Sequence, residues 1–352
     1  MLTTKLKDKF AELQDYFRGH KVIIAFSGGA DSTLLAKIAQ EYSADALAVT
    51  VDNGVMPSGF TESVREIAGK LGIPHLIIEE NLLKNPNFAS NPPNRCYLCK
   101  KNIHGGINEI LQEKGFDFVA DGTNISDLLE DRPGVEVNYE KDIHMPLVEV
   151  GLNSLEVREL LKDMQISYSP STTCLATRIP SGSFLIMKKL ERIDYAEKLL
   201  RNLSGTEVLR VRDEDGTAVI EMDYNSILDG QTFSYIDSEL KAVGFRKVTL
   251  NLAGSPPHKK DVVIYRPCRN DKNRIMLETE LPYLLDLEKS CEGLKQLGTV
   301  KCSLDMGVAL IEIDEINITL FSKGKIVARG VKDRNDAEDV LRCLMPHIRR
   351  KL

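Results

Sequence analysis

The chain has no tryptophan among its 352 residues, and aromatic residues make up only 6% of it. It also has no apolar run of about 18 or more residues, so the sequence predicts no membrane-spanning helix. Residues 1–19 have the pattern of a charged amphipathic helix and not of a signal peptide. The seven cysteines are odd in number and lack the spacing of a disulfide scaffold, which is typical of a reducing compartment. We therefore expect a cytoplasmic protein without a membrane partner.

A strong excess of one charge is absent too. The net charge is −6 and the isoelectric point is about 5.7, with 42% hydrophobic and 28% charged residues. A large nucleic-acid surface is usually basic, so we expect no nucleic-acid partner. The length predicts about two or three domains of ordinary globular composition.

The most informative stretch is residues 22–32. An apolar run at 22–26 predicts a buried strand, which ends at Ser27-Gly28-Gly29, and an apolar-periodic helix follows at about 30–42. Two glycines let backbone N–H groups come close to an anion, and the helix dipole places its positive end there. The pattern indicates a phosphate site, although a turn that only joins strand and helix is the alternative.

The residue types in this loop suit a nucleotide with a metal ion. Ser27 and Ser32 can donate hydroxyl hydrogen bonds, whereas Asp31 would repel a phosphate unless a Mg²⁺ ion lay between them. The spacing is neither Gly-Lys-Ser/Thr nor Gly-x-Gly-x-x-Gly. Ser-Gly-Gly-x-Asp-Ser resembles the pyrophosphate loop of the PP-loop ATP-pyrophosphatases, which cleave ATP between the α and β phosphates and adenylate a substrate oxygen. The resemblance implies ATP binding by Ser27, Gly28, Gly29, Asp31 and Ser32, and a catalytic role for Asp31.

Strands and helices alternate after this loop, which predicts the α/β class with a parallel sheet. Apolar runs predict strands at 46–51, 74–78 and 116–120, with helices at 58–71 and 103–114. Ligands of such sheets bind beyond the carboxyl ends of the strands, where Asp52 and Gly122-Thr123-Asn124 fall. One pocket can therefore hold one nucleotide. The resemblance implies that Asp52 lies by the adenine and ribose, with Gly122, Thr123 and Asn124 on the opposite side.

Three cysteines are candidates for chemistry. Cys96 and Cys99 stand at C-x-x-C spacing, where two thiols can share a metal, a disulfide or a cluster, and Cys174 is a third candidate. Zinc binding with His104, a redox dithiol and an inert pair are the alternatives for Cys96 and Cys99. The other four cysteines have no common spacing and are interpreted as small buried residues: Cys268, Cys291, Cys302 and Cys343.

Several longer motifs carry a closer resemblance. They are Asp121-Gly122-Thr123-Asn124, Asp131-Arg132-Pro133-Gly134, Pro146-Leu147, Cys174-Leu175-Ala176-Thr177-Arg178-Ile179-Pro180 and Gly244-Phe245-Arg246-Lys247-Val248-Thr249-Leu250. Together they resemble the LarE family of PP-loop sulfur transferases over residues 5–268. This family adenylates a carboxylate of pyridinium-3,5-biscarboxylic acid mononucleotide, replaces an oxygen with sulfur and repeats the step on the second carboxylate. Its product becomes the nickel-pincer nucleotide of lactate racemase.

The resemblance implies two routes for sulfur. In one subtype the residue that matches Cys174 gives up its own sulfur and becomes dehydroalanine. In the other, three cysteines hold a [4Fe-4S] cluster, and an extra sulfide on the open iron is transferred. Because this chain has Cys96, Cys99 and Cys174, we favour the cluster form.

Arginines near Cys174 are candidates for binding the substrate phosphate. Arg178 follows Cys174 by four residues, and Arg210 and Arg212 alternate on one face of a predicted strand. The resemblance implies that all three grip the phosphate, while two solvated arginines on an edge strand are the alternative for Arg210 and Arg212. Glu197 and Glu221 are interpreted as surface carboxylates, with a metal site as the alternative.

Other segments depart from the family or lie outside it. Residues 169–173 and 255–260 differ from the family's usual sequence, which leaves the exact substrate open. The domains expected are an adenylating domain at 1–180, a substrate domain at 181–272 and a small α+β module at 273–352. In the module the sequence predicts helices at 277–298 and 335–349 and strands at 308–313, 316–321 and 326–330. Its role and any homo-oligomer remain open.

The sequence thus predicts an ATP-dependent sulfur transferase for a small mononucleotide. One rival is a PP-loop enzyme of tRNA thiolation, and another is an amide-forming synthetase, which would explain the loop but not the three cysteines. A zinc- or cluster-binding regulator that senses ATP without turnover is a third. The sulfur source is not determined by the sequence.

Overall fold

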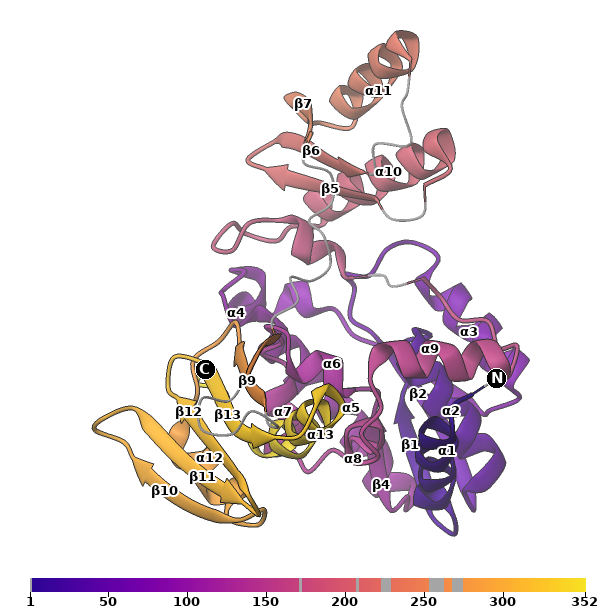
Figure 1. Ribbon diagram of the computed structural model, residues 1–352. Helices are drawn as coiled ribbons and strands as arrows, with labels where there is room; N and C mark the ends of the chain where they lie inside the picture. The colour runs from indigo at the N-terminus through magenta and orange to yellow at the C-terminus, as the bar shows by residue number, and fades with distance from the viewer. Residues whose placement is uncertain (1, 171–172, 207–208, 223–228, 253–262, 268–274) are drawn as a thin grey trace.

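The computed structural model describes residues 2–352 except 171–172, 207–208, 223–228, 253–262 and 268–274, and it contains three sheets (Figure 1). The first sheet is four-stranded and parallel, in the order β3-β2-β1-β4. The second is three-stranded, in the order β5-β6-β7, and the third is six-stranded and antiparallel, in the order β10-β11-β12-β13-β9-β8. The first sheet confirms the α/β class that the sequence predicts.

The first sheet and its helices occupy the indigo-to-magenta part of Figure 1. Its strands are β1 (Lys21–Ala25), β2 (Asp45–Asp52), β3 (His75–Glu79) and β4 (Phe118–Asp121). The longer helices are α1 (Thr4–Phe17), α2 (Ala30–Tyr42), α3 (Phe60–Leu71), α5 (Arg95–Lys114) and α9 (Ser154–Asp163). The short ones are η1 (Leu82–Lys84), α4 (Pro86–Ala89), α6 (Ile125–Leu128), α7 (Val135–Glu140), α8 (Pro146–Glu149) and η2 (Leu175–Arg178).

The central strand β1 explains both layers of helices. Val22 and Ile24 point to the core formed with α1, α2, α3 and α9, whereas Ile23 points to the opposite core, which Ile107 of α5 completes. All three of these strand residues are fully buried, as a parallel strand between two helical layers requires. Because β1 lies between β2 and β4, the strand order changes direction beside it, and a crevice forms at the carboxyl ends of β1 and β4.

The second sheet packs on two longer helices, α10 (Met187–Ser204) and α11 (Gly230–Ala242). Its strands are β5 (Leu209–Glu214), β6 (Thr217–Met222) and β7 (Lys247–Leu250). Strands β5 and β6 form an antiparallel hairpin whose two turn residues, Asp215 and Gly216, both have positive φ angles. Such a turn matches the twist of the two paired strands in a two-residue hairpin. Because side chains alternate along β5, Arg210 and Arg212 lie on one face of it.

The third sheet forms the yellow and orange part of Figure 1, and its helices are α12 (Leu287–Leu294), α13 (Arg334–Leu344) and η3 (Met345–His347). Its strands are β8 (Val263–Pro267), β9 (Ile275–Glu280), β10 (Thr299–Ser303), β11 (Val308–Ile313), β12 (Ile316–Phe321) and β13 (Lys325–Val331). Its apolar core also contains Ile125, Leu128, Val135, Met145 and Val148 from the first part of the chain. The third sheet therefore packs against the α6–α8 segment and shares one core with it.

Two predicted helices differ from the structure. The predicted helix at 277–298 is a strand at its start (β9) and a helix only at Leu287–Leu294, because Ile275–Glu280 pairs with β13 on one side and β8 on the other. The predicted helix at 103–114 begins at Arg95 instead, so the C-x-x-C motif occupies its first turns. The division at 180/181 and 272/273 stays a prediction, since apolar clusters cross both boundaries.

No helix in the described ranges is long and apolar enough to cross a bilayer.

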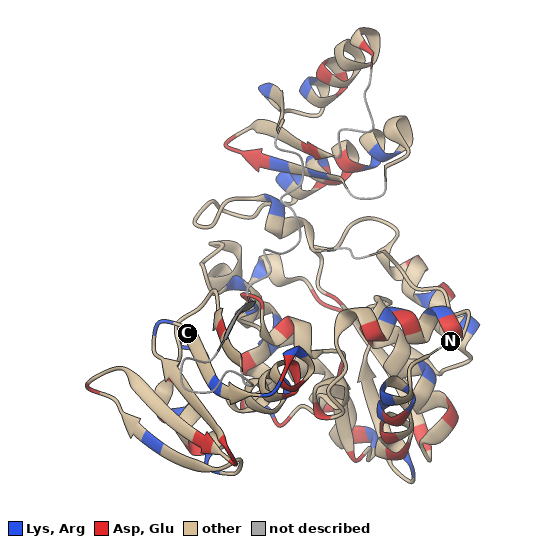
Figure 2. Cartoon of the chain, in the orientation of Figure 1, with Lys and Arg blue, Asp and Glu red and all other residues tan. Residues whose placement is uncertain are grey.

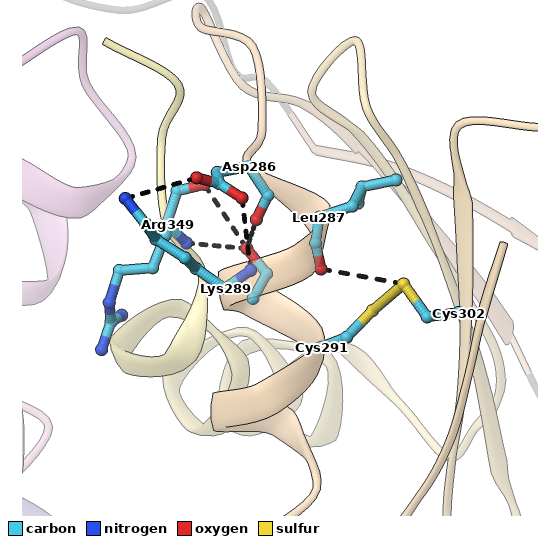
Figure 3. Close-up of a disulfide and its surroundings, with 7 residues drawn as sticks. Asp286, Leu287, Lys289, Cys291, Cys302 and Arg349 are labelled. Atoms are coloured by element: carbon cyan, nitrogen blue, oxygen red, sulfur yellow. Dashed lines mark hydrogen bonds and ion pairs between the residues drawn. A yellow bond between two sulfur atoms is a disulfide. The ribbon is translucent and has the colours of Figure 1, made fainter. Parts of the chain in front are cut away.

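The structure corrects part of the expectation for the four remaining cysteines. Cys291 of α12 and Cys302 of β10 form a disulfide (Figure 3), whereas the sequence analysis expected small buried residues with no common spacing. Cys291 is buried, but Cys302 is exposed. Cys343 is exposed and not buried, and Cys268 lies outside the described residues. The two thiols are 11 residues apart in the sequence and can pair because α12 packs against β10. Sequence spacing alone does not reveal this packing.

We expect reduction of the Cys291–Cys302 disulfide to destabilise the third sheet, because the bond restricts the unfolded chain. The expected loss is about 2–3 kcal/mol in the free energy of unfolding, measured by urea titration of oxidised and reduced protein. Cys343→Ala serves as the control and leaves both titrations unchanged. Equal stabilities, with no Cys291–Cys302 peptide in a non-reduced digest, would contradict the expectation.

Candidate functional site

The phosphate loop lies between β1 and α2, where the sequence predicts it. The Ser27 and Ser32 hydroxyls are 3.1 Å apart, the Ser27 N–H donates to Ser32 Oγ over 3.2 Å, and the first turn of α2 begins after Gly29. Gly28 has a φ of +72°, which an L side chain rarely adopts. The loop is thus a compact turn whose backbone N–H groups stand at a helix N-terminus, as an anion site requires.

Gly122 lies against this loop because β4 is the neighbour of β1. A Cβ atom at Gly122 would lie 2.9 Å from the Ser32 backbone nitrogen and 3.2 Å from the Asp31 carbonyl carbon. Only glycine allows two backbones to come this close. The structure therefore brings together two of the predicted nucleotide-binding elements, the loop and the end of β4.

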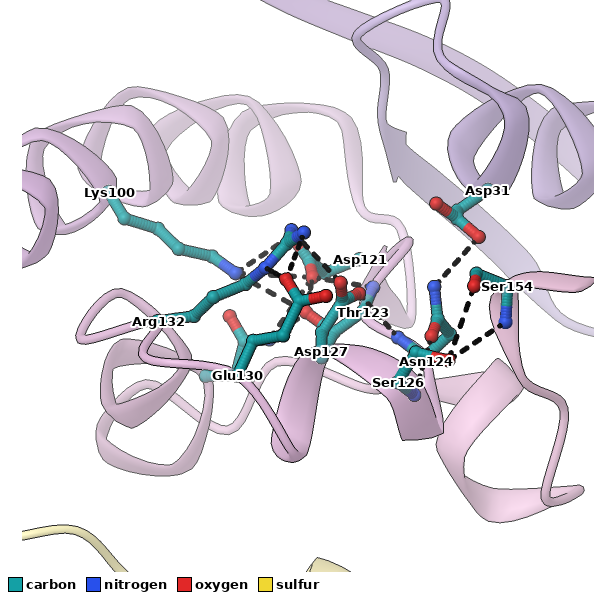
Figure 4. A network of polar contacts seen from close by, with 11 residues as sticks. Asp31, Lys100, Asp121, Thr123, Asn124, Ser126, Asp127, Glu130, Arg132 and Ser154 are labelled. Carbon is teal, nitrogen blue, oxygen red and sulfur yellow. Dashed lines mark hydrogen bonds and ion pairs between the residues drawn. The ribbon is translucent and has the colours of Figure 1, made fainter. Parts of the chain in front are cut away.

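Asp31 is held by Asn124, whose Nδ2 donates to Asp31 Oδ1 over 2.9 Å (Figure 4). Asn124 is fixed in turn by a capping box at the start of α6, in which Asp127 accepts the Asn124 backbone N–H. Burial, and next the carboxylate of Asp127, raise the pKa of Asp31 to about 6, while Asn124 and Arg132 lower it. A desolvated carboxylate beside a second carboxylate fits a divalent cation, which would supply the charge that both lack.

A network behind Gly122 was not found by sequence reasoning. Asp121 accepts hydrogen bonds from Lys100 Nζ (3.2 Å), the Thr123 N–H (2.9 Å) and Asn138 Nδ2 (3.1 Å). His104 Nε2 lies 3.7 Å from the Asp121 carboxylate. These contacts keep the pKa of buried Asp121 below its usual range despite desolvation. The network fixes the turn after β4. In the sequence only Asp121, at the end of a predicted strand, pointed to it, because Asn138 lies in a short helix that carries no motif.

The end of β2 lies beside the cysteines. The Gly54 N–H donates to the predicted nucleotide contact Asp52, and the neighbouring Asn53 donates from Nδ2 to Cys99 Sγ over 3.3 Å. At the start of η2, the Leu175 N–H donates to the Val55 carbonyl over 2.9 Å. The chain from Asp52 to Val55 thus joins the predicted nucleotide edge of the sheet to both cysteine segments, and no sequence motif pointed to this role of Asn53.

The three candidate thiols lie in one neighbourhood. Arg95, at the start of α5, donates from Nη1 to the Ala176 carbonyl over 3.1 Å, so the C-x-x-C turn is tied to the segment of Cys174. Cys96 is exposed, whereas Cys99 and Cys174 are partly buried beside the apolar core that the second sheet forms with α10 and α11. The positive end of α5 and the Arg95 guanidinium both favour a thiolate at this place.

The thiols also act on one another electrostatically. Burial, and then the neighbouring Cys174 and Cys96, raise the pKa of Cys99 to about 12, against the influence of the Asn53 N–H. Burial likewise raises the pKa of Cys174, against the influence of Arg95. Cys96 thus acts on both buried thiols, and the three cysteines place soft sulfur donors close together, the ligand type that an iron–sulfur group uses.

The zinc alternative for Cys96 and Cys99 is not supported. Within the parts of the chain that the structure describes, no three His, Cys, Asp or Glu side chains are grouped as ligands of one metal ion. His104 is 1% exposed and faces Asp121 instead. The same finding applies to Cys96, Cys99 and Cys174, so a cluster on these thiols is a proposal and not an observation.

The predicted arginines form one cluster with two carboxylates. Arg178 Nε donates to Glu197 Oε1 over 2.6 Å, and Arg212 Nε donates to Glu221 Oε1 over 2.7 Å. Arg210 has no ion pair among the described residues, and burial, followed by the nearby Arg178 and Arg212, lowers the pKa of its guanidinium. Glu221 and Glu197 offset this effect only in part, so an anion beside Arg210 would be favourable.

The structure corrects the interpretation of the two carboxylates. Glu197 is fully buried and Glu221 is 6% exposed, so neither is a surface residue. Both are needed because three arginines in one place would otherwise repel one another. The cluster lies next to Cys174, since Thr177 accepts from Arg178 Nη1 (2.7 Å) and donates to the Cys174 carbonyl (2.7 Å).

We expect Gly122→Ala to weaken the predicted ATP binding by roughly tenfold or more. The new Cβ would force the Ser32 backbone to move, and such a shift costs about 1–3 kcal/mol. Isothermal titration of the purified protein with ATP and Mg²⁺ measures the change. Gly105→Ala is the matched control, because nothing lies within 4 Å of a Cβ there. Unchanged affinity in Gly122→Ala would place the nucleotide elsewhere.

The protein should lose stability in acid through His104. Burial lowers the pKa of His104 from 6.5 to about 4, so the unfolded chain binds the proton first as the pH falls. The stability is complete above pH 6.5 and declines by about 3 kcal/mol as the pH falls to about 4. Urea titrations of wild type and His104→Gln across this window measure it, and the variant should show a shallower decline. Identical slopes would contradict the burial of a neutral His104.

Comparisons with known proteins identify the family of the chain. A family model described as a PP-loop domain matches residues 2–87. An uncharacterized protein of Synechocystis sp. is 33% identical over 269 residues, which cover 74% of this chain and 99% of the relative. The pyridinium-3,5-bisthiocarboxylic acid mononucleotide synthase of Lactiplantibacillus plantarum is 30% identical over 258 residues, which cover 72% of this chain and 92% of the synthase. A tRNA-specific 2-thiouridylase of Desulfitobacterium hafniense is 29% identical over 126 residues, only 29% of this chain. The chain therefore belongs to the PP-loop family of ATP-utilising enzymes, and within it to the family of the Lactiplantibacillus synthase.

Proposed function

We propose that this protein is an ATP-dependent sulfur transferase that adenylates a substrate carboxylate and converts it to a thiocarboxylate. The substrate proposed is pyridinium-3,5-biscarboxylic acid mononucleotide, because the Lactiplantibacillus relative is named as the synthase of the corresponding bisthiocarboxylic acid. The observation that carries the proposal is the meeting of three parts: the phosphate loop, the thiols of Cys96, Cys99 and Cys174, and the arginine cluster. Contacts through Asn53 and Thr177 join these parts into one site.

The adenylation half of the reaction would use the crevice at β1 and β4. The loop N–H groups and the Ser27 and Ser32 hydroxyls would bind the phosphates, and Asp31 would hold Mg²⁺. A substrate carboxylate oxygen would attack the α-phosphorus, and pyrophosphate would leave. The acyl adenylate that results has AMP as its leaving group, so a weak electrophile becomes reactive.

The second half would use the cysteines. Cys96, Cys99 and Cys174 would hold a [4Fe-4S] cluster, which when bound supplies a sulfide at its iron without a protein ligand. Arg210, with Arg212 beside it, would bind the substrate phosphate and so aim the activated carboxylate toward Cys174. The sacrificial route at Cys174 is the alternative, and both routes need Cys174 at this position.

The rival in tRNA thiolation is less well supported. Figure 2 shows that the positions of basic and acidic residues are intermingled along all three parts of the chain, and the net charge is −6. RNA-binding enzymes usually present a basic face. Three arginines beside the thiols, two of them paired with buried carboxylates, suit one phosphate group better than an RNA backbone. A filter-binding assay with bulk tRNA distinguishes the two, and only the rival expects binding.

We expect Cys174→Ala to abolish thiocarboxylate formation and to keep adenylation, because Asp31 and the loop stay intact. Substrate-dependent exchange of labelled pyrophosphate into ATP measures the first half, and mass spectrometry of the substrate measures the second. Exposed Cys343→Ala is the matched control and keeps both. Loss of both halves in Cys174→Ala would contradict the role given to Cys174.

Metal analysis of protein purified without oxygen tests the cluster. About four irons and four acid-labile sulfides per chain, lost in Cys96→Ala, would support it. A colourless protein that loses the mass of H₂S at Cys174 after one turnover would instead make Cys174 the sacrificed donor.

A further inference from the structure

Arg132 lies in the turn between α6 and α7, and Figure 4 shows it beside Asp127 and Glu130, with Asn124 between these residues and Asp31. Its Nη1 is 2.9 Å from Asp127 Oδ1, and its Nε and Nη2 donate to Glu130 Oε2 over 3.1 and 3.0 Å. A guanidinium has five N–H donors, so two remain free in this arrangement. Its side chain is 54% exposed, and a ligand in the crevice can therefore reach it.

The phosphate loop itself carries no cation, since residues 27–32 contain neither lysine nor arginine. Triphosphate binding and pyrophosphate release need positive charge, and one Mg²⁺ ion offsets only part of the phosphate charge. Two basic side chains stand near this end of β4. Lys100 is 21% exposed and is directed to Asp121 and Thr123, whereas Arg132 is more exposed and influences Asp31 electrostatically. Arg132 is thus the better placed of the two for a phosphate.

The turn that carries Arg132 is held by the end of the chain. Arg350 Nη1 is 2.7 Å from Asp131 Oδ1, and the Arg350 N–H donates to Glu136 Oε1 over 2.9 Å. Tyr283 donates from its hydroxyl to the Leu128 carbonyl over 2.6 Å, and the Arg350 guanidinium lies 5.0 Å from the centre of the Tyr283 ring. Residues on both sides of Arg132 are therefore fixed by groups more than 140 positions away, in the segment after residue 273.

We propose that Arg132 binds the β- and γ-phosphates of ATP and the departing pyrophosphate, and that Arg350 is the positioning residue that holds its turn in place. This inference rests on the proposed adenylation, and it gives the 273–352 segment a role in the first half-reaction. Binding of the phosphates would replace the surface contact with Glu130, while Asp127 keeps the guanidinium oriented. The planar fork of Arg132 matches two phosphate oxygens at once.

Calorimetric titrations with Mg²⁺ and three probes test Arg132 without the carboxylate substrate. We expect Arg132→Gln to weaken the binding of ATP and of inorganic pyrophosphate by about tenfold or more and to leave AMP binding unchanged. Arg132→Lys should recover part of the loss, because it keeps the charge but not the fork. The control is Arg18→Gln, another exposed arginine paired with a carboxylate, at 58% exposure. Equal loss for AMP, or no loss for pyrophosphate, would overturn the assignment.

Arg350 is tested in the full chain against a matched residue of the same segment. Arg342 is 15% exposed against 13% for Arg350, and it also reaches the first part of the chain, through Glu156 at 3.6 Å. We expect Arg350→Gln to raise the Kd for pyrophosphate and the KM for ATP by about fivefold with kcat nearly unchanged. Arg342→Gln should leave both unchanged even if it lowers Tm. Equal effects of the two variants on pyrophosphate would reduce Arg350 to a general structural contact and overturn its positioning role.

The outcomes separate this inference from the proposed function. Normal thiocarboxylate formation together with an unaffected pyrophosphate affinity in Arg132→Gln would overturn the inference alone. The expected titrations with no thiocarboxylate product from wild type would overturn the sulfur-transfer proposal alone. A wild-type protein that binds neither ATP nor pyrophosphate would overturn both.

Discussion

The close approach of Gly122 to the backbone of Asp31 and Ser32 is the constraint on which the rest of the site depends. It follows from the strand order, since β4 lies beside β1 and both end at the same edge. Once the two backbones touch, Asn124 two residues later can reach Asp31, and Asp121 one residue earlier is buried among hydrogen-bond donors. The capping box of α6 then fixes where the chain goes next. A single contact without side chains thus sets the geometry of the whole crevice.

The candidate site contains charged groups that the neighbouring residues of the protein do not fully neutralise. The pKa of Asp31 is raised to about 6 by burial and by Asp127, and the pKa of Arg210 is lowered by burial and by two neighbouring arginines. Each group is in an unfavourable environment that a ligand of opposite charge would relieve. In the proposed function a cation would bind at Asp31 and an anion at Arg210, and hydrogen bonds through Asn53, Leu175 and Thr177 connect the thiol segments to both regions.

Sequence reasoning found the local features and missed those that depend on distant partners. The strand, glycine turn and helix at 21–42 could be predicted because an apolar run, two glycines and a periodic helix each act locally. The strand Ile275–Glu280 could not, because Leu277-Glu278-Thr279-Glu280 has helical composition and becomes a strand only by pairing with β13. The candidate site shows the same limit. Cys96, Cys99 and Cys174 could be selected by residue type, whereas the hydrogen bond from Asn53 and the pairing of Arg178 with Glu197 needed the fold.

The shared core of the α6–α8 segment and the third sheet has a consequence for how the chain folds during synthesis. Ile125 and Leu128 emerge from the ribosome long before Leu341, Leu344 and Ile348, which belong to the same apolar core in the finished protein. Contacts of such high sequence separation form late and slowly. The apolar side of the α6–α8 segment therefore stays exposed until residues 341–348 have been synthesised. We expect a nascent molecule to need a chaperone most during this interval.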